Sequence, residues 1–243
     1  MIKLASTDIV IAHGIWRLLN KVMTFVPYDI SVIGASESGK TTLDMQLTTR
    51  GEIRKLKDTD RTHHAKGWLG KYKLPLTSRK RVTSDGHLAK TIVSRDLGGH
   101  IQYHSTWLRD MINRNCSSVV VVIDDRHMKD PRNVDNQTAL GYLVRGLSDK
   151  KNIPKGLTWR GWWRAKTYYP QRVIVLANKA DEWMTDEDHN TWEKGFISRH
   201  KIFDVFRPDL YKLQSLNIPV YMDAVSARYG WNVQDGLYKG LTI

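Results

Sequence analysis

The strongest chemical signal in the sequence is a glycine-bounded loop that follows the short apolar run 28–33: Gly34-Ala35-Ser36-Glu37-Ser38-Gly39-Lys40-Thr41. It matches the pattern G-x-x-x-x-G-K-[ST] in full. Its glycines let the backbone curl so that N–H groups face a phosphate chain, and the start of the next helix adds partial positive charge. Lys40 is expected to bridge the β- and γ-phosphates and Thr41 to ligate Mg²⁺. The loop therefore predicts a nucleoside triphosphate, with Glu37 turned outward to avoid repulsion.

A second motif, Asn178-Lys179-Ala180-Asp181, follows the apolar run 172–177 and names the base. A carboxylate can accept two hydrogen bonds from the N1–H and N2–H₂ edge of guanine, whereas adenine presents an acceptor at N1. Asp181 should therefore attract guanine and repel adenine. At a strand end downstream of a phosphate loop, this tetrapeptide predicts a guanine nucleotide, GTP or GDP.

With these motifs in order, the chain from residue 28 to about 237 resembles the small GTPases of the Ras superfamily, and most nearly the Arf and signal-recognition-particle-receptor β branch. Three further segments carry the resemblance: Thr41-Thr42 after Lys40, Asp96-Leu97-Gly98-Gly99 as a D-x-x-G motif, and Ser226-Ala227-Arg228 as an S-A-K-like loop. The segment between Lys40 and Asn178 is longer than in a minimal GTPase.

The resemblance implies roles for individual residues. Asp96 would hold Mg²⁺ through water, and the Gly99 N–H would contact the γ-phosphate. Ser226 and Ala227 would offer backbone N–H groups to guanine O6, and the Lys179 stem would lie over the base.

The switch threonine has two candidates. Thr77 follows Pro75 and precedes Asp96 by nineteen residues, close to the Arf arrangement, and is preferred as a Mg²⁺ ligand that also serves catalysis. Thr83 is its rival, but it reads as part of a strand.

His100 stands where Arf and Ras proteins usually carry glutamine. Translational GTPases and the receptor β-subunits also use histidine there. Such a histidine can orient water and stabilise charge near the γ-phosphate once a partner positions it. The alternative is a solvent-facing histidine that leaves hydrolysis slow.

Short apolar runs alternate with amphipathic segments along the chain. Strands are expected over 28–33, 79–84, 88–95, 119–123, 172–177 and 220–224, and helices over 41–53, 103–113, 135–148 and 186–206. The residues 84–87 (Ser-Asp-Gly-His) have the signature of a hairpin turn. The pattern predicts an α/β protein of the P-loop NTPase (small GTPase) fold: a mostly parallel sheet, one antiparallel edge hairpin, and helices on both faces.

The net charge of +13 is concentrated in two stretches. Residues 50–81 carry eleven Lys or Arg against three Asp or Glu, and residues 150–172 carry seven against none. They coincide with expected insertions near 54–76 and 149–171 in a GTPase domain of residues 28–243. The second mixes cations with five aromatic residues, which suits a protein effector or regulator, a nucleic acid or an anionic membrane surface. Its tryptophans could instead pack the insertion onto the domain.

Residues 1–27 are expected to contain an amphipathic helix with a polar stripe at His13, Arg17, Asn20, Lys21 and Thr24. The helix could pack on its own domain or lie on a membrane or partner. Cations in its second half disfavour spanning a bilayer, and the single cysteine excludes an internal disulfide.

The sequence therefore predicts a protein that is cytoplasmic or peripheral on a membrane. It is expected to act as a Mg²⁺-dependent switch that hydrolyses GTP to GDP and phosphate, slowly without a partner. The alternative is a nucleotide-binding scaffold with little hydrolysis that acts through its basic, Trp-rich insertion.

Overall fold

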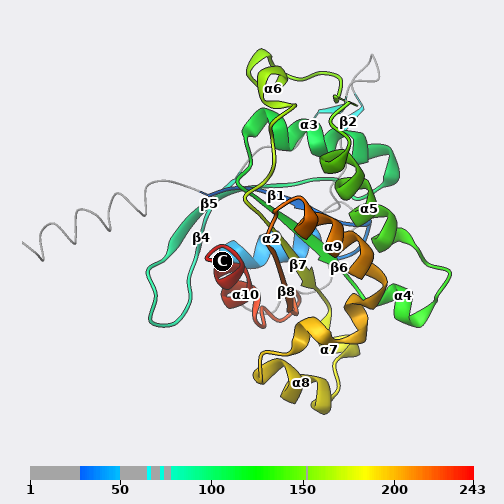
Figure 1. The fold of residues 1–243 in the computed structure, drawn as a ribbon. Helices are drawn as coiled ribbons and strands as arrows, with labels where there is room; N and C mark the ends of the chain where they lie inside the picture. The colour runs from blue at the N-terminus through cyan, green and yellow to red at the C-terminus, as the bar shows by residue number, and fades with distance from the viewer. Residues whose placement is uncertain (1–27, 50–64, 67–71, 74–77, 152) are drawn as a thin grey trace, which may run out of the picture.

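The computed structural model describes residues 28–49, 65–66, 72–73, 78–151 and 153–243. A six-stranded sheet in the order β4-β5-β1-β6-β7-β8 forms the centre of the domain (Figure 1). Its strands are β1 (Tyr28–Ile33), β4 (Ser78–Val82), β5 (Lys90–Asp96), β6 (Ser118–Ile123), β7 (Arg172–Ala177) and β8 (Val220–Ala224). A separate short pair, β2 (Ala65–Lys66) and β3 (Tyr72–Lys73), is antiparallel.

The sheet is parallel except at one edge. β1 pairs in parallel with β5 and β6, and β7 with β6 and β8, whereas β4 pairs antiparallel with β5. The β4–β5 connection contains a turn in which the His87 N–H donates to the Ser84 carbonyl. The predicted mostly parallel sheet and its edge hairpin are both confirmed.

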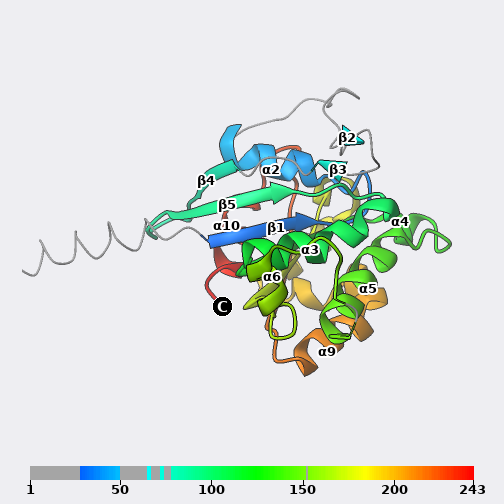
Figure 2. The ribbon, with the colours of Figure 1, turned by 90° about the horizontal axis from the view of Figure 1, so that it is seen from above.

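Helices cover both faces of the sheet, as Figure 2 shows from above. The α-helices are α2 (Lys40–Thr49), α3 (His104–Arg114), α4 (Arg126–Lys129), α5 (Asp135–Ser148), α6 (Trp159–Arg164), α7 (Ala180–Trp183), α8 (Asp186–Glu193), α9 (Arg207–Ser215) and α10 (Val233–Gly240). Three 3₁₀ turns are η2 (Ile101–Tyr103), η3 (Ile197–Arg199) and η4 (Lys201–Phe206).

The central strands are apolar throughout because both of their faces are buried. In β6, Val119, Val121 and Ile123 join the larger core, which includes side chains of α3, α5 and α9. Val120 and Val122, on the opposite face, join the core formed with α2 and α10. The period-two alternation of a strand thus divides one run of apolar residues between two cores.

The prediction of one or two helices over residues 186–206 is wrong in part. Only α8 is an α-helix there. It is followed by Gly195, whose φ of 76° cannot continue a right-handed helix, and by η3 and η4. α9 was not predicted, and Pro208 in its first turn is a common helix start.

Several predictions lie outside the described residues. These are the helix within 1–27, Thr77, and most of the insertion near 54–76. Among the residues that are described, none of the helices is long and apolar enough to cross a membrane.

The second insertion, 149–171, contains α6. The interpretation that its tryptophans pack it onto the domain is wrong for Trp159, Trp162 and Trp163, which are 72%, 56% and 70% exposed.

Candidate functional site

Four segments of the predicted motifs, together with Asp124, meet at one edge of the sheet. The loop 34–39 follows β1, Asp96 ends β5, Asp124 follows β6, and the loops after β7 and β8 begin at Asn178 and Val225. Because these strands are parallel, their carboxyl ends share an edge, which is where open α/β sheets commonly bind ligands.

The loop 34–39 requires its two glycines. Gly34 has a φ of 146°, and a Cβ atom there would lie 2.2 Å from the Val122 carbonyl oxygen. Gly39 has a φ of 89°, and its Cβ would lie 2.0 Å from the Asn178 side-chain nitrogen. Both positions combine positive φ with close packing, so a side chain is excluded on two grounds. Glu37 is exposed, as expected, and adopts a left-handed φ of 64°.

Lys40 is the first residue of α2, and its side chain returns to the loop. Its Nζ donates to the Ala35 carbonyl at 2.6 Å, and the side chain is buried. Burial lowers the pKa of Lys40 to about 8, against an opposing influence from the Asp96 carboxylate. A buried cation beside a helix N-terminus is well suited to an anionic partner.

Thr41 and Asp96 bring together oxygen ligands for a hard cation. The Thr41 Oγ1 donates to the Asp96 Oδ2 at 2.6 Å, across the gap between α2 and the end of β5. Within the described part of the chain, His, Cys, Asp and Glu side chains do not gather in threes or more as a metal site. A hydroxyl and one carboxylate fit Mg²⁺, which usually keeps several waters and takes other oxygens from substrate phosphates.

Gly99 lies directly against the loop. A Cβ on Gly99 would come within 2.5 Å of Ala35 backbone atoms, so only glycine allows this approach. Two side chains of α3 hold the Gly98–Gly99 backbone. The Trp107 Nε1 donates to the Gly98 carbonyl at 3.0 Å, and the His104 Nε2 donates to the Gly99 carbonyl at 3.2 Å. The backbone of Gly99 is thereby fixed next to residues 35 and 36.

Asn178 ties the two halves of the site together. Its side-chain nitrogen donates to the Ser38 carbonyl at 2.9 Å, and its side-chain oxygen accepts from the Ala227 N–H at 2.9 Å. One amide thus joins the loop after β1 to the loop after β8. The neighbouring Ala180 N–H adds a bond to the Val225 carbonyl.

Asp181 is exposed beside this junction. One of its carboxylate oxygens accepts from the Ser226 hydroxyl at 2.5 Å. The contact fixes the carboxylate while leaving acceptor capacity on both oxygens, as recognition of two adjacent N–H donors requires.

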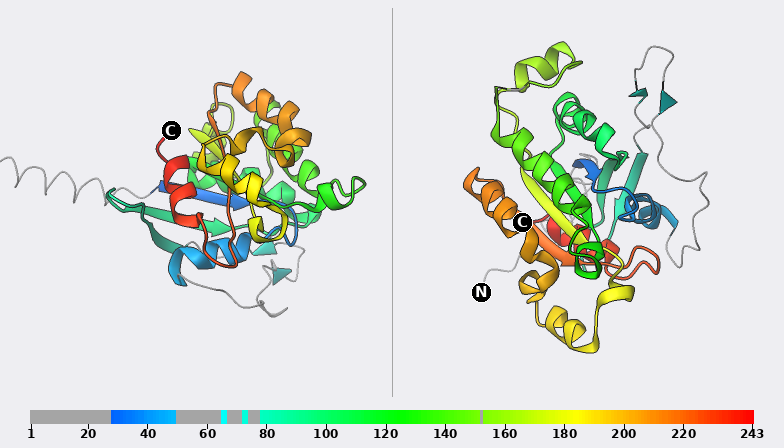
Figure 3. Two further views of the ribbon diagram at one scale, coloured as in Figure 1. Left: turned by 90° about the horizontal axis from the view of Figure 1, so that it is seen from below. Right: turned by 90° about the vertical axis from the view of Figure 1, so that its right-hand side faces the viewer.

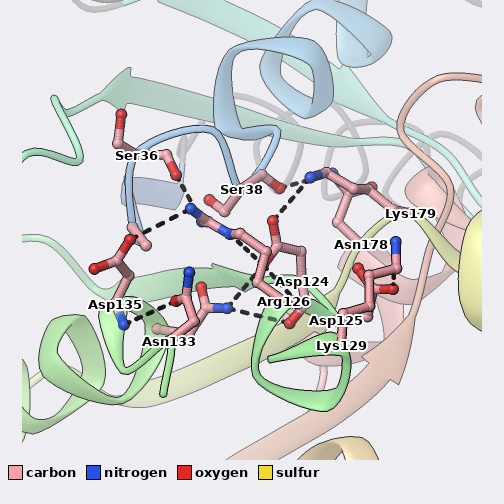
Figure 4. Close-up of polar contacts among 12 residues, drawn as sticks. Ser36, Ser38, Asp124, Asp125, Arg126, Lys129, Asn133, Asp135, Asn178 and Lys179 are labelled. Atoms are coloured by element: carbon pink, nitrogen blue, oxygen red, sulfur yellow. Dashed lines mark hydrogen bonds and ion pairs between the residues drawn. The ribbon is translucent and has the colours of Figure 1, made fainter. Parts of the chain in front are cut away.

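Sequence reasoning missed a charged cluster under the loop, drawn in Figure 4. The buried Asp124 accepts from Lys179 Nζ at 2.8 Å, from Arg126 Nε at 2.9 Å and from the Asn136 amide at 2.8 Å. Arg126 also donates to the Ser36 carbonyl at 2.6 Å. The available signal was local: Asp124 is the first polar residue after the buried strand β6, at the same sheet edge as the glycine loop.

The charge of Asp124 is stabilised by these contacts. Burial alone would raise its pKa, but hydrogen bonds from Lys179, Arg126 and Asn136 hold the pKa of Asp124 below its ordinary value. The ionised Asp124 carboxylate therefore holds Lys179 directly and holds the glycine loop through Arg126, which donates to the Ser36 carbonyl.

Two of the predicted site residues, His100 and Thr83, are not held within this network of contacts. His100 is exposed, immediately after Gly99 and before η2. Thr83 follows β4 at the end of the strand that is far from Asp96, because Val82 pairs with Lys90, whereas Ser78 pairs with Ser94. At about 3.4 Å per residue, the Lys90 end of β5 lies roughly 20 Å from Asp96, which argues against Thr83 as a ligand of the same metal. The described residue next to Thr77, Ser78, lies toward the Asp96 end.

Comparison with known proteins gives similarity in structure only. Neither a protein-family model nor a curated protein sequence matches this chain. Its structure is similar to that of the Arl6 (BBS3) small GTPase from Trypanosoma brucei with the bound nucleotide analogue GppNp, with 14% identity, a TM-score of 0.50, and coverage of 89% of this chain and 96% of that one. At this identity the likeness shows the fold alone, the P-loop NTPase fold that this chain shares with that small GTPase.

A second match is to the bacterial selenocysteine-specific elongation factor EF-Sec, with 14% identity and a TM-score of 0.43. It covers 89% of this chain but 28% of that chain, so the present chain spans little more than a quarter of the elongation factor.

Proposed function

We propose that this protein binds GTP and hydrolyses it to GDP and phosphate, acting as a Mg²⁺-dependent molecular switch. The observation that carries the proposal is the pair of hydrogen bonds made by Asn178, to Ser38 and to Ala227. They join the loop 34–39 to the segments that carry Asp181 and Ala227, which supports the proposal of one site for both the phosphates and the guanine base.

The phosphates would lie in the glycine loop. Backbone N–H groups of residues 34–42 and of Gly99 would face the phosphate oxygens, and the Lys40 ammonium would leave Ala35 to meet the β- and γ-phosphates. At the other end, Asp181 would accept from guanine N1–H and N2–H₂, with Ser226 and Ala227 N–H groups near O6. The Lys179 stem, held at Asp124, would cover the base.

The Mg²⁺ ligands would be the Thr41 hydroxyl, Thr77 and, through water, Asp96. When bound, the ion neutralises charge on the β- and γ-phosphates. The Thr41–Asp96 contact supports this assignment, because it brings the two oxygen donors within 2.6 Å of each other before a metal enters.

Hydrolysis requires water in line with the γ-phosphate. His100 would place that water, and Lys40 and the N–H groups of the loop and of Gly99 would stabilise charge on the phosphoryl oxygens. Because His100 is exposed, we expect slow hydrolysis until a regulatory protein orders its ring. This exposure also favours a second candidate function, a cytoplasmic nucleotide-dependent scaffold that hydrolyses little.

Within the small GTPases we place the chain nearest the Arf and signal-recognition-particle-receptor β branch. Support comes from the sequence, in Thr41-Thr42 and Asp96-Leu97-Gly98-Gly99. A protein effector or regulator that reads the nucleotide state is implied by a switch of this kind.

The base is tested by displacement of a fluorescent GDP analogue from the full chain with GTP, ATP and XTP. GTP should compete at least about 100-fold better than ATP, and Asp181→Asn should lose GTP and gain XTP affinity because the amide donates where the carboxylate accepted. Glu182→Gln, which neutralises the exposed carboxylate next in the chain, is the control and should keep the wild-type preference. If ATP and GTP displaced the fluorescent GDP analogue from the wild-type protein equally well, a guanine site would be refuted.

A further inference from the structure

Three tryptophans form an exposed surface on α6, here called the indole face: Trp159, Trp162 and Trp163. They are 72%, 56% and 70% exposed. The spacing i, i+3, i+4 places them on one side of a single helical turn. Trp162 and Trp163 pack edge to face, with ring centroids 5.7 Å apart and planes at 86°. Such a contiguous exposed aromatic patch is a marker of an interaction surface.

The indole face is held in place by hydrogen bonds to the body of the domain. The Asn113 side-chain oxygen accepts from the Thr158 N–H at 2.8 Å, and the Thr158 hydroxyl caps α6 by accepting from the Gly161 N–H. At the far end, Arg164 donates to the Ile112 carbonyl at 2.8 Å and the buried Tyr168 hydroxyl to that of Cys116 at 3.0 Å. The tryptophans are therefore presented by an ordered support, which reduces the entropy cost of binding.

Cations lie on the same insertion and in a cleft that the insertion borders. A cleft of about 520 Å³ between α3, α5 and the insertion is lined by Arg109, Arg145 and Lys155, with Asp149 as its lining carboxylate. On the insertion itself, Arg160 and Lys166 are exposed, and residues 150–171 contain no acidic residue. The indole face and the basic cleft together offer apolar rings and positive charge to one partner.

The indole face lies away from the proposed nucleotide site formed by the glycine loop and Asp181. α5 ends at Ser148 and β7 begins at Arg172, while the Gln171 N–H donates to the Ser117 carbonyl just before β6 begins. The insertion is thus anchored at the amino ends of the strands, whereas the glycine loop and Asp181 lie at the carboxyl ends. In Figures 1 and 3, α6 projects from the body of the domain beyond α3 and α5.

We infer that the indole face and the basic cleft dock on the surface of an anionic phospholipid bilayer. Tryptophan rings settle at the level of lipid headgroups, and nearby Lys and Arg side chains attract anionic lipid. A convex turn that carries three indoles can enter a flat interface. Single-stranded nucleic acid, by contrast, requires bases to stack along a positively charged groove. Here the basic cleft is lined by Arg109, Arg145 and Lys155 and by none of the three tryptophans, which lie on the projecting helix α6.

Co-sedimentation of the full chain with vesicles tests the inference. Binding to vesicles that contain phosphatidylserine should exceed binding to pure phosphatidylcholine vesicles and should fall with salt. The combined substitution of Trp159, Trp162 and Trp163 by serine should lower the partition coefficient at least about tenfold, because each indole would lose contact with the interface. Replacing Arg109 and Lys155 by glutamine should lower it about fivefold per charge.

The matched control replaces an exposed aromatic residue and cation on α9, Tyr211→Ser with Lys212→Gln, and should leave vesicle binding unchanged. Brominated lipids should quench tryptophan fluorescence in the wild type and not in the triple variant, which locates the contact at the indoles. Nucleotide affinity should be the same in all variants, so the test stands whether or not the protein binds GTP.

Three results would overturn the inference: no sedimentation with phosphatidylserine vesicles, equal sedimentation of the triple variant, or quenching that persists without the three tryptophans. A single-stranded oligonucleotide that binds the indole face at physiological salt, where vesicles do not, would assign it to nucleic acid instead. Circular dichroism of the triple variant should match the wild type, because these side chains are exposed and their removal leaves the support intact.

Discussion

The Lys179 Nζ donates to the Asp124 carboxylate at 2.8 Å, a contact that joins the loop after β7 to the end of β6. Both residues flank the proposed nucleotide site, and Asp124 is fully buried whereas the Lys179 side chain is 29% exposed. Replacing the carboxylate by an amide, Asp124→Asn, removes the charge that pairs with both Lys179 and Arg126 and leaves Arg126 only its longer ion pair with the exposed Asp135.

We expect Asp124→Asn to lower the free energy of unfolding by about 2 kcal/mol, below the full cost of breaking a buried pair because both cations are partly exposed. GTP affinity should fall about tenfold, since Lys179 and the glycine loop lose their support. Urea denaturation and fluorescent-nucleotide titration measure the two effects. Glu182→Gln, which breaks the exposed Lys129–Glu182 pair, should change stability by less than about 0.5 kcal/mol; an equal loss in both variants would contradict the role of Asp124.

The same carboxylate gives a pH dependence. Its pKa is lower in the folded protein than the ordinary value of 3.8. Its stabilisation is therefore fully present above pH 3.8 and is lost as the pH falls through the lower, folded value. The stability difference between wild type and Asp124→Asn should shrink in that acidic range and stay constant from pH 5 to 7. A difference that already shrinks above pH 5 would contradict a depressed pKa.

Lys40 makes the opposite prediction. Burial lowers its pKa from 10.5 to about 8, so without nucleotide its charge destabilises the fold most below pH 8, and the cost disappears as the pH rises from 8 to 10.5. Lys40→Met should raise the free energy of unfolding of the nucleotide-free protein at pH 7 by up to about 3 kcal/mol, while nucleotide binding is lost. Thermal unfolding of both proteins at pH 7 and pH 10 measures this, and a variant less stable than wild type at pH 7 would contradict it.

Nucleotide binding should also report the proton on Lys40. Phosphates favour the ammonium form, so wild-type affinity should decrease above pH 8 and binding near pH 8 should take up protons. Calorimetric titration in buffers of different ionisation enthalpy measures that uptake directly. An affinity that stays flat from pH 7 to pH 9.5 would show that Lys40 does not titrate there.

Glu37 carries both a left-handed backbone and a charge next to the proposed phosphates. Glu37→Gly should stabilise the protein by about 1 kcal/mol through relief of the positive φ and raise GTP affinity up to about fivefold at low salt by removing repulsion. Glu37→Gln separates the two, because it keeps the backbone conformation and should raise affinity without raising stability. No change in affinity for either variant would place the carboxylate too far from the phosphates to matter.

His100 and His104 should separate catalysis from folding. His100 is exposed, so His100→Ala should leave stability unchanged and slow single-turnover GTP hydrolysis about 100-fold once an activating partner is present. His104 is buried, donates to the Gly99 carbonyl and packs at a tilt against Trp107, with ring centroids 4.1 Å apart. His104→Ala should therefore lower the free energy of unfolding by about 2 kcal/mol. An unchanged rate for His100→Ala under every condition would remove it from the mechanism.

Local pattern determined much of this protein. The strands over 28–33, 172–177 and 220–224 and the helix over 135–148 occur within the predicted bounds, because a run of apolar residues or an amphipathic period leaves few ways to bury its side chains. The glycine loop was likewise readable, since Gly34 and Gly39 occupy conformations that other residues adopt only with strain.

Tertiary structure decided what no local pattern encodes. Asp124 meets Lys179, and Arg126 meets the Ser36 carbonyl, only because the carboxyl end of β6 lies between those of β1 and β7. α9 was missed because its short apolar stripe, buried at Leu210 and Leu213, gains meaning only from the core beside it. The tryptophans of α6 had no local signal for exposure, because an indole is equally suited to a core or an interface, and only packing against the rest of the domain determines which side faces solvent.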